Sequence, residues 1–139
     1  MQLDAVAEAM YRAVSFSVGE RPNYAHIYDL FIDGGLLIRN SGQAPRISTV
    51  EQFIAPNQAL VDSGELVSFV EAEIAHRTEI FGRIAHRLST YTKSAVTRAG
   101  ATETRGVNSM QFVETASGWR MSSVAWDDER PGLTIPNLH

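Results

Sequence analysis

Two histidines and a tyrosine are the side chains best suited to acid–base chemistry in this chain. His76 and His86 lie on either side of a Gly-Arg pair. An imidazole changes charge near neutral pH, so either histidine is a candidate general base. Glu79 would orient His86, and Tyr11 or Tyr91 would serve as the acid. The alternative is that each histidine is a hydrogen-bonded strand residue with no part in chemistry.

Other groups of charged residues have weaker claims to a site. Arg39 and Arg87 with Asp33 and Glu79 contain the residue types of an acid–arginine–acid set, but solvated salt bridges explain them as well. The acidic run 127–129 could hold a cation, but a solvated strand end is the simpler explanation. Two histidines without a carboxylate at ligand spacing are a poor zinc signal. The sequence therefore predicts no metal site and no cofactor, and the lack of cysteine excludes disulfides and thiolate chemistry.

Large aromatic and thioether side chains occur along the whole chain and could line an apolar ligand cavity. The residues expected to line it are Tyr11, Tyr28, Phe53, Tyr91, Met110, Trp119 and Trp126. Plain core packing, or for one tryptophan a contact between subunits, explains the same residues equally well.

Composition excludes several classes of protein. The chain has 139 residues, of which 44% are hydrophobic, and this predicts a single domain with an ordinary core. The net charge of −4 comes from mixed signs, so there is no basic field for nucleic acid. No apolar run is long enough to span a membrane. Asp4 and Glu8 stand where a signal peptide would be basic, so we expect a cytoplasmic protein.

Four long strands are expected in the second half of the chain, at residues 67–81, 84 to about 95, about 104–115, and 119–127. In the first of these, period-two alternation gives an apolar side with Val70 and Ile74, which predicts a strand buried on that side. Gly82-Arg83 suits a two-residue hairpin turn that places Glu79 opposite His86. A three-residue turn would instead place His76 opposite His86.

The last hairpin is expected to be apolar on both faces. Met110, Phe112, Val124 and Trp126 would share one face, and Val113, Trp119 and Met121 the other. Helices can cover one face, and a second copy of the chain is the simplest cover for the other. Strands of this length must also bend, and Gly106 is a candidate bulge.

Helices are expected before these strands. Apolar spacing predicts helices over 2–18 and after Asn23, then a short strand at 36–38, and a helix opened by a capping box at Ser48 or Thr49. Pro56 should kink or restart that helix. The prediction is an α+β fold with three N-terminal helices packed on a strongly curved mixed sheet of one short and four long, mainly antiparallel strands. This would form one domain over 1–139, a cone with an internal pocket, and residues 129–139 would be a tail.

The segments 28–31, 35–38, 80–85 and 118–121, in this order, resemble the NTF2-like superfamily, also called the SnoaL-like or cystatin-like α+β cone. The likeness is greatest to uncharacterised bacterial members. It implies a conical pocket and a homodimer formed through the sheet. The position of the catalytic base in the isomerases of the superfamily falls on Arg39 or Asn40, and neither is a base at neutral pH. Tyr11 matches the pocket tyrosine of those enzymes.

Three functions remain open from the sequence. The first is binding of a small, mostly apolar molecule in the pocket. The second is a cofactor-free cyclase, dehydratase or isomerase with His76 or His86 as base. The third is an association module without a ligand, because this fold serves many unrelated functions.

Overall fold

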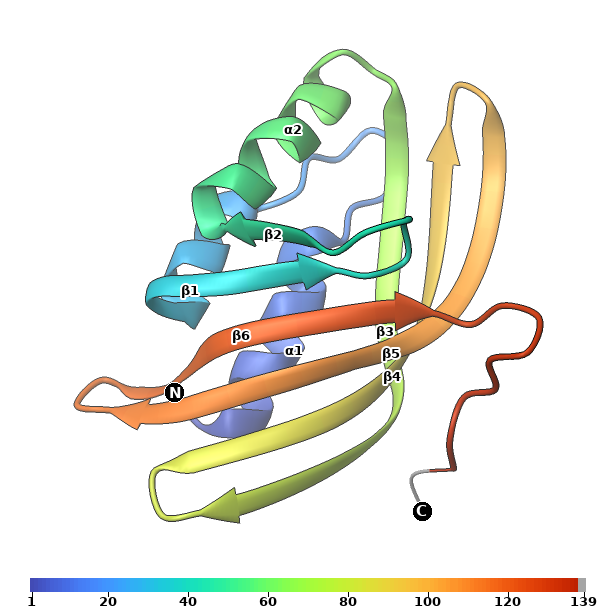
Figure 1. Ribbon diagram of the computed structural model, residues 1–139. Helices are drawn as coiled ribbons and strands as arrows, with labels where there is room; N and C mark the ends of the chain where they lie inside the picture. Colours follow the sequence, from blue (N-terminus) through green and yellow to red (C-terminus); the bar gives the residue numbers. More distant parts are fainter. Residues whose placement is uncertain (138–139) are drawn as a thin grey trace.

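A computed structural model describes residues 1–137 of the chain. In this range the elements are α1 (Leu3–Val14), the 3₁₀-helix η1 (Tyr24–Leu30), β1 (Phe31–Arg39), β2 (Arg46–Thr49), α2 (Val50–Asp62), β3 (Leu66–Phe81), β4 (Ile84–Thr97), β5 (Gly100–Thr115) and β6 (Gly118–Asp128). The strands form one sheet in the order β2-β1-β6-β5-β4-β3. The β1–β6 pairing is parallel, and the other pairings are antiparallel. Figure 1 shows the long strands bending and α1 and α2 lying on the same side of them.

The α+β prediction is confirmed, but two details of it are wrong. The described range has six strands where five were expected, because residues 46–49 pair with β1 and form β2. The helices are not all N-terminal, since α2 follows β1 and β2. Strand β1 contains a register shift between Phe31 and Leu36, and it continues through the shift because β6 pairs with both of these residues.

The opening of α2 follows one of the two predicted capping boxes. Thr49 Oγ1 accepts from the Gln52 amide at 3.2 Å, and Gln52 Oε1 accepts from the Thr49 amide at 3.0 Å. Pro56 lies inside the helix, which neither ends nor restarts there.

The β3–β4 hairpin has the predicted register, with Glu79 opposite His86 and a positive φ of 57° at Gly82. The prediction of which face is buried was wrong. Val70 and Ile74 are 46% and 50% exposed, whereas Glu71 on the opposite face lines the interior. The interior can take this carboxylate because polar partners from other elements reach it.

The last hairpin differs from its predicted pattern at Ser122. Gln111 pairs with Ser123 but Phe112 pairs with Met121, so Ser122 is an extra residue in β6. This bulge moves the preceding part of β6 to the other face, and Met121 and Trp119 are buried together with Phe112. The argument that a second apolar face of this hairpin needs a cover therefore fails. Gly106 is not a bulge either, because it pairs in register with Tyr91.

The tail after β6 remains close to the sheet as far as it is described. The Glu129 amide donates to the Arg105 carbonyl at 2.8 Å, and Arg130 Nη1 donates to Asp127 Oδ1 at 2.7 Å. A cavity of about 310 Å³ lies between residues 134–137 of the tail and residues of the sheet that include Ile74 and Thr90. The last two residues of the predicted tail lie outside the described range. No helix between residues 1 and 137 is long and apolar enough to cross a membrane.

Candidate functional site

A cavity of about 350 Å³ lies between α1, α2 and the inner face of the sheet. This is within the size range of small-molecule sites. Most of its wall is apolar, with side chains from both helices and from the strands: Met10, Val14, Leu37, Phe53, Phe69, Met110, Val124 and Trp126. Phe53 of α2 and Trp126 of β6 meet edge to face, with ring centroids 6.1 Å apart.

Glu71 is the acidic residue in the wall of this cavity. Its Oε2 accepts a hydrogen bond from Asn108 Nδ2 at 3.2 Å, and its backbone amide donates to Ser15 Oγ at 3.0 Å. Burial raises the pKa of the Glu71 carboxyl to about 7, against the opposing effects of the Asn108 bond and the charge of Lys93. A carboxyl group with this pKa in a cavity can exchange a proton at neutral pH.

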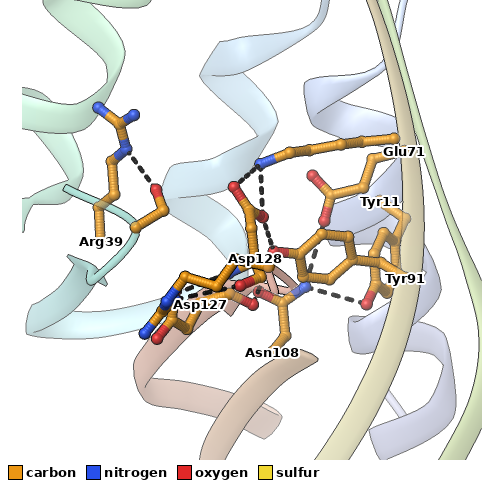
Figure 2. A network of polar contacts seen from close by, with 10 residues as sticks. Tyr11, Arg39, Glu71, Tyr91, Asn108, Asp127 and Asp128 are labelled. Carbon is orange, nitrogen blue, oxygen red and sulfur yellow. Dashed lines mark hydrogen bonds and ion pairs between the residues drawn. The ribbon is translucent and has the colours of Figure 1, made fainter. Parts of the chain in front are cut away.

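Figure 2 shows Tyr91 and Asp128 in a second polar group beside Glu71. Lys93 belongs to the same group through its contact with Asp128. The Tyr91 hydroxyl donates to Asp128, and Lys93 Nζ lies 2.9 Å from Asp128 Oδ1. Burial and the Asp128 carboxylate raise the pKa of the Tyr91 phenol. Gly106 makes this arrangement possible, because a Cβ on that residue would overlap the phenol oxygen of Tyr91.

A series of hydrogen bonds links the cavity to the N-terminal end of helix α1. Asn108 Nδ2 donates to the Tyr11 hydroxyl at 3.0 Å, and Tyr11 lies 2.5 Å from Ser89 Oγ. Because Ser89 donates its own proton to Glu73, Tyr11 is the donor to Ser89.

Arg87, which is 3% exposed, completes this series of hydrogen bonds. Its Nε donates to Glu73 at 3.0 Å and its Nη1 donates to Asp4 at 2.7 Å. These hydrogen bonds therefore connect helix α1 to strands β3 and β4. Burial raises the pKa of the phenol of Tyr11, which belongs to the same series.

Five of the seven residues predicted to bind a ligand line the cavity: Tyr11, Phe53, Tyr91, Met110 and Trp126. The other two do not. Trp119 is buried in the core at the far end of the last hairpin, and Tyr28 is 53% exposed.

Neither of the two predicted catalytic histidines lines the cavity. His86 is half exposed beside Glu79, with 2.8 Å between Nε2 and the carboxylate oxygen, and His76 is exposed opposite Ser89. Among residues 1–137, the cavity wall has Tyr11 from the predicted catalytic set and no histidine.

Several charged residues of the candidate acid–arginine–acid set and of the acidic run form ion pairs with other partners. Arg87 binds Glu73 and Asp4 in place of Glu79 and Asp33. Asp127 pairs with Arg130, and Asp128 pairs with Tyr91 and Lys93, so these carboxylates have partners within the chain.

The sequence reasoning missed Glu71 and Asn108 as site residues. The available signal was the alternation in β3, where the three glutamates Glu71, Glu73 and Glu79 lie on the side opposite the apolar one. A strand whose carboxylates share one face can turn that face to solvent or to a polar interior, and the pattern does not distinguish the two.

Comparison with known proteins identifies the fold. No family model and no curated protein matches the sequence. An uncharacterised protein with a cystatin-like fold from Caulobacter vibrioides superposes with a TM-score of 0.71 at 13% identity, over 93% of this chain and 88% of that one. A nuclear transport factor 2 (NTF2-like) superfamily protein from Salmonella enterica serovar Typhimurium superposes with a TM-score of 0.65 at 15% identity, over 83% and 84%.

A third structure is a candidate calcium/calmodulin-dependent kinase II association domain from Exiguobacterium sibiricum. It superposes with a TM-score of 0.69 at 12% identity, over 94% of this chain and 93% of that one. The chain therefore has the cystatin-like, NTF2-like fold, as the sequence resemblance predicted. At these identities the likeness concerns the fold and not the activity.

Proposed function

We propose that the protein binds a small, mostly apolar molecule in the cavity between α1, α2 and the sheet. The observation that supports this most strongly is the cavity itself, about 350 Å³ with a mainly apolar wall and polar groups gathered around Glu71. A space that served only as core would be filled, since protein interiors are close-packed. Phe53 and Trp126 offer ring faces and edges to an apolar ligand.

The test is to fill the cavity by enlarging a side chain of its wall. Val124→Phe places a larger side chain in the cavity wall, beside its strand partner Met110. It should abolish binding of a neutral aromatic probe, 2-naphthylacetamide, measured by isothermal titration calorimetry. Val18→Phe is the matched control, because Val18 is 70% exposed and outside the cavity wall. Equal binding by both variants would contradict the proposal.

A second candidate function is acid–base catalysis with Glu71 as the base, in place of the histidines first considered. It is supported by the raised pKa of Glu71 and by its Asn108 hydrogen bond within the cavity. The ketone 2-tetralone in D₂O offers a direct assay, because a positioned base accelerates exchange of its acidic C–H protons. Glu71→Gln should remove the acceleration seen by NMR, and His86→Ala should retain it.

We also propose that the protein forms a homodimer through the outer face of β3 and β4. Large apolar side chains are exposed on this face, and we define the outer apolar patch as Val70, Ile74, Phe81, Ile84 and Leu88. Exposed apolar area of this kind is commonly covered by a partner. The candidate association domain with the same fold is consistent with assembly.

A further inference from the structure

Two arginines face each other at one end of the cavity wall. Arg39 of β1 and Arg46 of β2 are direct partners across the strand pair, and both line the cavity. Two residues along the same strands, Leu37 and Ser48 are also partners, and both are buried in that wall. Since side chains alternate across a strand, the arginines lie on the cavity face of the sheet.

Both arginines are exposed, so solvent screens part of the repulsion between them, and a bound anion would lower what remains. Like charges directly opposite on neighbouring strands repel each other. Within residues 1–137 neither guanidinium forms an ion pair with a carboxylate, and Arg39 Nε donates to the Ser41 hydroxyl at 2.9 Å. Figure 2 shows Arg39 apart from the cluster around Glu71.

The charge of the cavity wall is opposite in sign to that of the whole chain. The chain has 16 acidic and 12 basic residues. The described wall has three cations, Arg39, Arg46 and Lys93, and one acidic residue, Glu71. Lys93 is compensated by Asp128. The uncompensated positive charge of the cavity is therefore on the two arginines.

We propose that the ligand is a small carboxylate with an apolar, ring-sized body, and that Arg39 and Arg46 bind its carboxylate. This inference rests on the proposed binding function and narrows it to one chemical class. A guanidinium presents a planar fork of donors that matches a carboxylate, and an anion between the two arginines lowers their repulsion. Arg39 is also the strand partner of Trp126, so a ligand held at this end has its apolar body beside the indole.

The experiment compares two probes of nearly the same shape, one with a charged carboxylate and the other with a neutral amide in its place. 2-Naphthylacetic acid, which is ionised at neutral pH, and its neutral amide 2-naphthylacetamide are titrated by calorimetry in low salt. The wild-type chain should bind the acid at least about tenfold more tightly than the amide, the size expected of charge-assisted hydrogen bonds. The double variant R39Q/R46Q should bring the ratio close to one, because it should weaken binding of the acid far more than binding of the amide.

Arg12→Gln is the matched control, because Arg12 is an exposed helix arginine outside the cavity wall. It should keep the wild-type preference for the acid. Equal affinity of the wild type for acid and amide, with Val124→Phe blocking both, would overturn the carboxylate inference and leave the binding function standing. Failure of both probes to bind, or binding unaffected by Val124→Phe, would overturn both proposals.

Discussion

Tyr91 lies directly opposite Gly106 across the β4–β5 ladder, and its phenol occupies the space that any side chain at residue 106 would need. The phenol is thereby directed to Asp128 at the end of β6. The polar end of the cavity thus depends on a glycine that contributes no side chain to it.

Gly106→Ala should destabilise the protein by about 1–3 kcal/mol, because the new Cβ must displace the Tyr91 phenol or the Asp127 carbonyl. Urea denaturation monitored by circular dichroism measures this. Gly42→Ala is the matched control, since the nearest atom to its Cβ would be 3.9 Å away. A loss no larger than that of the control would show that Tyr91 can move at little cost.

The pKa of Glu71 predicts a specific pH dependence of stability. Burial raises the pKa from 4.5 to about 7, so between these pH values the folded chain binds more protons at this residue than the unfolded chain. The contribution of Glu71 to the free energy of unfolding is therefore highest below pH 4.5. It falls by up to about 3 kcal/mol as the pH rises to 7, and it is constant above that.

The free energy of unfolding of the wild type minus that of Glu71→Gln should fall over this pH range by that amount. Urea denaturation at a series of pH values measures the difference. Glu114→Gln, at an exposed position, is the matched control. A difference for Glu71→Gln that does not change with pH would mean that the Glu71 carboxyl titrates as an ordinary solvated group.

The ion pair of Arg87 and Glu73 should be costly to break from one side. Arg87 is 3% exposed, so Glu73→Ala leaves a buried cation with one fewer partner and should cost about 3–5 kcal/mol. Arg21→Ala removes an exposed pair with Asp62 and should change stability by less than about 1 kcal/mol. Similar losses in the two variants would show that Arg87 is solvated when Glu73 is absent.

The proposed homodimer makes the outer apolar patch sensitive to charge. Ile84, which is 58% exposed, lies opposite Phe81, which is 84% exposed. Ile84→Glu should convert the dimer to a 15.3 kDa monomer in light scattering, since a buried carboxylate opposes association. Ile47→Glu on β2 is the control, as Ile47 is 62% exposed away from the patch. A monomeric wild type at micromolar concentration would reject the dimer.

Local features were predictable from the sequence by itself. The Gly82 turn and the Thr49–Gln52 capping box depend on residues two or three positions apart, and both formed as expected. The order of helices and long strands followed from periodicity, and the resemblance to the NTF2-like superfamily agreed with the fold. Five of the seven predicted ligand-binding residues line the cavity.

The tertiary structure decided which strand faces turned inward and which residues met there. Alternation in β3 showed that Glu71 and Val70 lie on opposite sides, but contacts from Asn108, 37 residues away, bring the carboxylate inside. The bulge at Ser122 exists only in the pairing with β5, and it buries Trp119 and Met121. Arg39 and Arg46 face each other only because β2 pairs with β1. Sequence periodicity is local, whereas the faces of a sheet and the partners of a buried charge are set by contacts between distant segments.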